Sequence, residues 1–156
     1  MKPRARKCPV PPGTKVFATL PLHHYRDAFT LTLSPGDRRS LEELLAARGT
    51  GLPERCLARL RDALVAPFGL KPIGKPGMAP FERLELGPDE AIYAVDDKHV
   101  DVRVAYLTRA ADAQRELTAT TLVRVNHPLG WIYLGAILPF HFLIVRRQLE
   151  RMAARP

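Results

Sequence analysis

The sequence predicts an α+β fold in which a curved antiparallel β-sheet wraps around a long C-terminal helix, with a short helix pair after the first strand. Three observations predict it. Segments that alternate between apolar and polar residues cluster between residues 81 and 126, short turns separate them, and a long apolar helical pattern follows. Because strands and helices are segregated along the chain, an antiparallel sheet is favoured over a parallel one.

We expect a single domain over residues 15–156, preceded by a basic, proline-rich N-terminal arm at residues 1–14. The arm contains PVPPG, which opposes regular secondary structure. The first strand is predicted at YRDAFTLTLS, because this segment alternates and contains aromatic and threonine residues.

Two short helices are predicted next. Ser40 and Glu43 have the spacing of a capping box, which begins a helix over LEELLAARG. Pro53 suits the first turn of a second helix, which ends before Pro67, so the two helices form a hairpin.

The remaining strands are predicted to form a meander, with RAADAQR as the last of its turns. Their segments are FERLELG, EAIYAVD, KHVDVRVAYLTR and ELTATTLVRVN. In the third segment one face carries Val100, Val102, Val104 and Tyr106, and the other carries His99, Asp101 and Arg103. We expect the terminal helix to lie across the concave face, as in a helix-grip architecture.

The terminal segment, from Leu129 to Val145, contains no formally charged residue and is followed by two arginines. It spans roughly 25 Å as a helix, which is short of the ~30 Å hydrocarbon core of a bilayer. Pro139 is expected to kink it. An apolar stripe continues past the arginines, so a core helix is favoured over peripheral membrane contact or a true span. The stripe consists of Trp131, Leu134, Leu138, Phe142, Val145, Leu149 and Met152.

Composition limits the classes of function. The net charge is +8 with 24 basic and 16 acidic residues, but much of the excess lies at the two ends, so we expect no nucleic-acid partner. The two cysteines do not form a disulfide framework, and the N-terminus lacks a signal-peptide pattern, which favours the cytoplasm. The histidines and acids have no metal-ligand spacing, so neither a metal nor a cofactor is expected.

Seven polar residues are the candidate ligand-binding set. If the face carrying His99, Asp101 and Arg103 is convex, these residues form a solvated charge ladder with the neighbouring strand. If the face lines a cavity, Asp101 must pair with an arginine, and a surplus arginine is then available to an anionic ligand. His141 is either a satisfied core histidine or a general base. The full set is His99, Asp101, Arg103, Arg124, Asn126, Tyr133 and His141.

DDKHVDVRV followed by TTLVRVNHPLGWIYLGAILPFHFLIVRRQL resembles the bacterial domain-of-unknown-function family 2867. The resemblance covers roughly residues 25–152. Trp131 departs from it, since the family pattern has a basic residue there. The resemblance implies a relation to the helix-grip superfamily of lipid-binding and cyclase-like proteins, and it assigns no biochemical role.

Three functions are compatible with these features. The first is binding of a small apolar or amphipathic ligand between the sheet and the terminal helix. The second is a cyclase or isomerase that uses His141 and Asp101 as acid and base. The third is a filled-core interaction protein, for which a homodimer is one form. No residue set in the sequence decides whether the chain is an enzyme.

Overall fold

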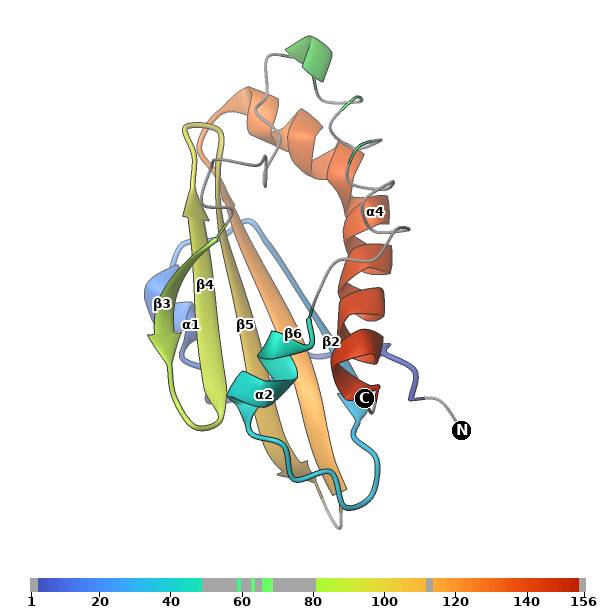
Figure 1. Cartoon of the computed structure of the whole chain (residues 1–156). Coiled ribbons are helices and arrows are strands. Elements are labelled where there is room, and N and C mark those ends of the chain that lie inside the picture. Colours follow the sequence, from blue (N-terminus) through green and yellow to red (C-terminus); the bar gives the residue numbers. More distant parts are fainter. Residues whose placement is uncertain are drawn as a thin grey trace.

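The computed structural model describes residues 3–48, 59, 63, 66–68, 81–111 and 114–154. The described strands form one six-stranded antiparallel sheet in the order β1-β2-β6-β5-β4-β3 (Figure 1). They are β1 (Arg6–Cys8), β2 (Tyr25–Thr32), β3 (Glu82–Leu86), β4 (Glu90–Asp96), β5 (Val100–Ala111) and β6 (Gln114–Val125). The helical elements are α1 (Val16–Thr19), α2 (Leu41–Ala46), the 3-10 turn η1 (Ala66–Phe68) and α4 (Pro128–Ala153). The predicted α+β class is confirmed.

The long helix α4 lies against one face of the sheet, which we call the inner face (Figure 1). Its second half packs on β2 and β6 through Val145, Leu149 and Met152. Its first half packs through Tyr133 and Leu134 on valines of β5 and β6. The predicted stripe is thus directed inward at Leu134, Val145, Leu149 and Met152, but Trp131 is 53% exposed and does not belong to it. Pro139 lies inside the helix, which bends along its length (Figure 1).

The opposite, outer face is covered in part by α1. Val16 and Leu20 are buried against Ile92, Ala105 and Leu122, one residue from each of the three central strands. Helix α1 was not predicted from the sequence, because its four residues are too few to show a helical period.

The N-terminal segment is more structured than the sequence predicts. Residues Arg6–Cys8 form the edge strand β1, which pairs with β2, and Ala5 is buried in the core. Pro3 precedes this strand and Pro9, Pro11 and Pro12 follow it, so none of them interrupts its pairing. Thr14 then hydrogen-bonds to the buried carboxylate of Glu90.

The first predicted helix is confirmed as α2, with Ser40 accepting a hydrogen bond from the backbone N–H of Glu43 and the Glu43 side chain accepting one from Ser40. The second predicted helix lies outside the described residues, apart from isolated positions. The last hairpin is tighter than predicted: β5 extends to Ala111 and β6 begins at Gln114. Residues near its tip are exposed on both faces, so the sequence there lacks the alternation of a half-buried strand and was predicted as a loop. The two strands nevertheless stay paired as far as Ala111 and Gln114.

Candidate functional site

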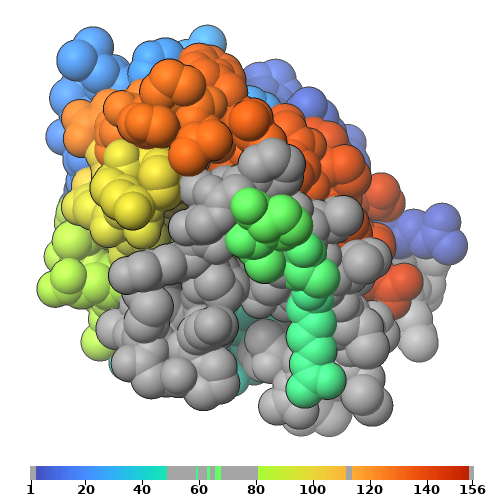
Figure 2. Space-filling view, turned by 90° about the horizontal axis from the view of Figure 1, so that it is seen from above, coloured from blue at the N-terminus to red at the C-terminus, as the bar shows by residue number. Residues whose placement is uncertain are grey.

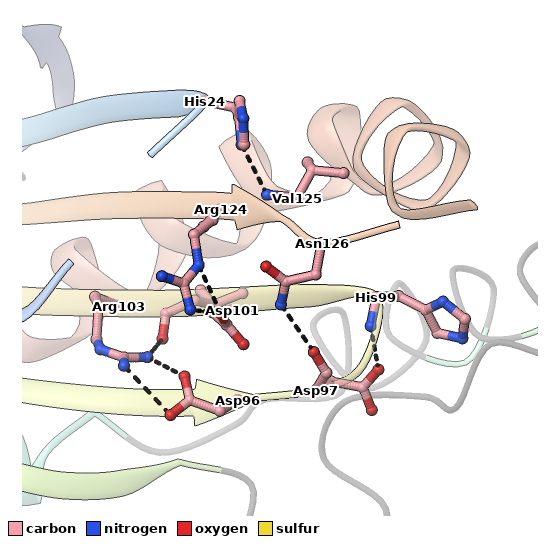
Figure 3. A network of polar contacts seen from close by, with 10 residues as sticks. His24, Asp96, Asp97, His99, Asp101, Arg103, Arg124, Val125 and Asn126 are labelled. Carbon is pink, nitrogen blue, oxygen red and sulfur yellow. Dashed lines mark hydrogen bonds and ion pairs between the residues drawn. The ribbon is translucent and has the colours of Figure 1, made fainter. Parts of the chain in front are cut away.

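The seven predicted site residues separate into two groups on opposite faces of the sheet. The first group lies on and beside β5 and β6 (Figure 3). It consists of Asp101 and Arg103 of β5, Arg124 of β6, His99 just before β5 and Asn126 just after β6. In β5, Val100, Val102 and Val104 contact the cluster under α4. Because neighbouring strand residues point to opposite faces, Asp101 and Arg103 therefore lie on the outer face.

The outer face carries two ion pairs between neighbouring strands. Arg124 lies opposite Asp101 in the strand register, and its Nε donates to Asp101 Oδ2 at 2.9 Å. Arg103 donates through both terminal nitrogens to Asp96, at 2.5 and 3.3 Å. A cross-strand charge ladder is what we expected if this face were convex. The expected ladder was solvated, however, whereas Asp101 and Arg103 are buried. Both arginines have a carboxylate partner, so no surplus cation remains in this ladder.

His99 and Asn126 tie the β4–β5 turn to the start of α4 (Figure 3). The backbone N–H of Asn126 donates to the carbonyl of His99 at 2.9 Å, and the Asn126 side chain donates to the carbonyl of Asp97 at 3.2 Å. Asp97 in turn accepts from the backbone N–H of His99. The His99 ring packs edge-on against His127, the N-cap of α4. These contacts explain much of the DDKH and NHPLG stretches as the junction that fixes the helix on the sheet.

Tyr133 and His141 form the second group, on the sheet-facing side of α4. Tyr133 packs with Val100, Val102 and Val123. His141 reaches the sheet, where its Nε2 lies 3.0 Å from Oδ2 and 3.2 Å from Oδ1 of Asp27. The enzyme hypothesis paired His141 with Asp101, but Asp101 lies on the other face and is bonded to Arg124.

The pair formed by Asp27 and His141 is enclosed in the sheet–helix interior. The Asp27 side chain is 1% exposed and that of His141 is 17% exposed. Tyr25, two residues earlier on the same strand face, donates its hydroxyl to Asp27 Oδ2 at 2.7 Å. Burial, followed by this hydrogen bond, raises the pKa of Tyr25, so the phenol stays protonated and remains a donor at neutral pH.

Asp27 and Tyr25 were missed as site residues, although the sequence contains a signal for them. In the first strand Tyr25, Asp27, Phe29 and Leu31 share one face, and Asp27 is the single charged residue among them. A carboxylate on a core-facing position needs a partner, because burying an unpaired charge is very costly. That requirement could have pointed to the histidine of the core helix.

Arg48, which follows α2, lies over the inner face. Its guanidinium carbon is 4.8 Å from the ring centre of Tyr93 and 5.6 Å from that of Tyr106. These two rings pack edge-on against each other, so they form a platform for the cation. Among the described residues we find no carboxylate paired with Arg48.

The middle of α4 is less well packed than its ends. The buried residues of the helix lie between Gly130 and Leu134 and between Val145 and Ala153, whereas none between residues 135 and 144 is buried. On the sheet, Val104 and its cross-strand neighbour Tyr93 are likewise only partly buried, although Val102 and Tyr106 on either side are buried. Residues on both facing surfaces are therefore only partly buried at the centre of the interface.

Thr121 lies next to the pair on the inner face, directly opposite Asp27 in the register of β2 and β6. Its hydroxyl is buried, and within the described part of the chain it has no hydrogen-bond partner. The described residues also contain no group of three histidine, cysteine or acidic side chains that could hold a metal ion.

The comparisons with known proteins agree with the sequence pattern. Residues 19–148 match the model of the family described as "Protein of unknown function (DUF2867)". No curated protein and no solved structure matches the chain.

Proposed function

The chain belongs to the DUF2867 family, and we propose that it binds a small amphipathic ligand between the inner face of the sheet and the middle of α4. The observation that carries this proposal is the packing of α4, which is buried at both ends and only partly buried between them. Protein interiors are close-packed, so surface left accessible at the centre of a sheet–helix interface suits an occupant other than the protein's own side chains.

The lining of this central region is mostly apolar. Phe29 of β2 and Phe142 of α4 pack ring against ring at 5.9 Å between their centres. Val104 belongs to the packing of both core clusters, one at each end of the helix, and so marks the position where they meet. Such walls favour a ligand whose larger part is hydrocarbon.

The pair of Asp27 and His141 supports a polar group on the ligand. A buried ionisable pair is often no better for stability than apolar residues of the same volume, so its presence is better explained by recognition than by core packing. His141 uses Nε2 toward Asp27, and its other ring nitrogen, for which the described part of the chain shows no hydrogen bond, would orient the ligand.

Arg48 favours an acidic polar group. From the sequence, Arg103 and Arg124 were the expected contacts of an anionic ligand group. Both are bonded to carboxylates on the outer face, so we assign this contact to Arg48 instead. A guanidinium held by two aromatic rings is weakly hydrated and presents several donors in one plane, which suits a carboxylate or phosphate. We therefore propose an amphipathic anion as the ligand.

The test uses a dansyl-labelled undecanoic acid as probe, titrated into the full-length protein. We expect saturable binding with increased dansyl fluorescence, weakened about tenfold by Arg48→Gln, because one charged hydrogen-bonding contact is lost. The matched control is Arg124→Gln, which removes an arginine of the outer face and is expected to leave the affinity unchanged. Absence of saturable binding, or an equal loss in both variants, would contradict the proposal.

The same pair of residues also supports a second candidate, an acid–base enzyme in which His141 transfers a proton and Asp27 orients the ring. The two candidates differ in the fate of a ligand that co-purifies with the protein. Recovery of the same compound after prolonged incubation supports binding. Conversion into an isomer, lost in His141→Gln, supports the enzyme.

A further inference from the structure

The outward side of α4 is apolar as well as its inward side. Trp131 is 53% exposed, Ile132 46% and Leu143 40%. Gly135 and Pro139 are also exposed, so the exposed residues recur at helical spacing along one side. We call this side the outward stripe; it consists of Trp131, Ile132, Gly135, Pro139 and Leu143.

The stripe is extended by the segment before β2. Leu22 is 74% exposed, and His24 in the same segment packs edge-on against Trp131 at 5.5 Å between ring centres. In Figure 2 the first half of α4, drawn in orange, lies at the surface beside blue parts of the N-terminal region. Large apolar side chains from two segments are therefore exposed in one region, and such patches mark interaction sites.

A helix that is apolar on all sides is normally either buried in protein or in contact with lipid. By length and composition α4 could cross a membrane, yet its sheet-facing side is engaged through Leu134, Val145 and Leu149. His141 on that side is hydrogen-bonded to Asp27. The helix in this fold can thus offer only its outward stripe to a membrane, in the manner of a helix lying in the interface.

The charges beside the stripe are positive. Arg146 and Arg147 are exposed and directly follow it, one turn beyond Leu143. Between Leu129 and Gln148 the helix has no acidic residue; the first one, Glu150, accepts a hydrogen bond from the backbone N–H of Ala5. Tryptophan at one end and arginines at the other are typical of segments at the membrane–water interface.

We propose that the outward stripe binds peripherally to an anionic membrane surface, with Trp131 and Ile132 inserted among the lipids and Arg146 and Arg147 at their head groups. A second copy of the chain is the other occupant that an apolar face suggests. The charge favours lipid, because self-association would oppose two chains that each have a net charge of +8. This proposal is independent of ligand binding, since it uses the other side of the helix.

Trp131 is the single tryptophan of the chain and reports on the stripe directly. The full-length protein is mixed with vesicles of phosphatidylcholine alone or with added phosphatidylglycerol. We expect the Trp131 emission to shift to shorter wavelength with the anionic vesicles only, and brominated lipids to quench it. Binding should weaken as salt is added, because the arginine contribution is screened.

Two variants separate the apolar and the charged contributions. Ile132→Glu is expected to lower the vesicle partition coefficient at least about tenfold, because an inserted apolar side chain is replaced by a charge. The double variant Arg146→Gln and Arg147→Gln is expected to remove the preference for phosphatidylglycerol. Leu84→Glu alters an exposed leucine of β3 and is expected to change neither property.

Two outcomes would overturn the proposal. In the first, Trp131 emission is unchanged by anionic vesicles and stays accessible to acrylamide. In the second, sedimentation shows a dimer in which Trp131 is already shielded without lipid, and Ile132→Glu dissociates it. The second outcome would assign the stripe to another copy of the chain.

Discussion

Asp27 occupies the position at which the inner face departs most clearly from an ordinary apolar core. Its carboxylate accepts from Tyr25 at 2.7 Å and lies 3.0 Å from His141 Nε2, so residues from a strand and from α4 converge on one buried group. We expect Asp27 and His141 to act as a unit, so that their effects on stability are coupled.

A double-mutant cycle with Asp27→Asn and His141→Gln measures that coupling. We expect an interaction energy of about 0.5–3 kcal/mol in the free energy of unfolding, the range for residues in one hydrogen-bonded network. The measurement is urea unfolding followed by circular dichroism. His141→Gln combined with Asp96→Asn, on the outer face, should be additive; additivity of the first pair instead would show that Asp27 and His141 are energetically independent.

The loop after β2 contributes to the stability of the fold in a pH-dependent way. Hydrogen bonding from Arg39 holds the pKa of Asp37 below its ordinary value, and Arg115 of β6 donates to two carbonyls of the same loop. Because the folded pKa is lowered, this stabilisation is complete above the unfolded pKa of about 4 and is lost as the pH falls through the folded value.

Asp37→Asn should therefore destabilise the protein by roughly 1–2 kcal/mol at pH 7, because a charge-assisted contact is weakened. The difference between the two proteins should shrink as the pH is lowered below about 4. Urea unfolding of the wild type and of Asp37→Asn, at pH 7 and at a pH below about 4, measures this difference. An equal difference at neutral and acid pH would exclude ionisation of Asp37 as the cause.

The candidate site residues could be predicted only in part. Alternation along the strands predicted that Asp101 and Arg103 share a face, and it placed Arg124 on a neighbouring strand. Asp101 and Arg124 are ion-paired on the outer face, whereas Arg103 is paired with Asp96. Alternation does not show which face of the sheet the terminal helix covers. The helix covers the face of the valines, so Asp101, Arg103 and Arg124 lie on the outer face. Arg48 could not be found, because its contact with Tyr93 depends on how α2 is placed over the sheet.

At the scale of elements, two glycines of α4 have opposite surroundings. A Cβ at Gly130 would lie 2.4 Å from the backbone oxygen of His99 and 2.8 Å from a methyl group of Val125. At Gly135 nothing lies within 4 Å of such an atom. The start of α4 is thus in direct contact with the sheet, whereas the outward side at Gly135 is open.

Gly130→Ala and Gly135→Ala should accordingly change stability in opposite directions. The first is expected to cost about 1–3 kcal/mol, because the helix must move away from backbone that cannot yield. The second should add up to about 1 kcal/mol, because alanine favours the helix and meets no obstacle. Thermal and urea unfolding of the two variants test this; destabilisation by both would mean that Gly135 is also packed closely.

Elements with a clear local signal were predicted well. The capping box of Ser40 and Glu43 and the strands with strict alternation are examples, since their signals need no tertiary partner. The edge strand Arg6–Cys8 and helix α1 were missed, because both are short and depend on contacts with distant residues.

At the scale of the whole molecule, the sheet and α4 divide the chain into surfaces with different chemistry. The outer face carries paired charges, the inner face carries the Asp27–His141 pair among apolar groups, and the far side of α4 carries the outward stripe. We propose that a ligand occupies the region between the inner face and the middle of α4.

The most direct measurement of this claim is the stability and probe binding of Val104→Phe. Val104 is only partly buried at the centre of the inner face, whereas its neighbour Val102 is buried. We expect Val104→Phe to unfold at the same or a higher urea concentration than the wild type and no longer to bind the dansyl probe. Val102→Phe should cost about 1–3 kcal/mol through overpacking. Equal destabilisation by both substitutions would contradict ligand binding in this region, because it would show that the interior is already filled.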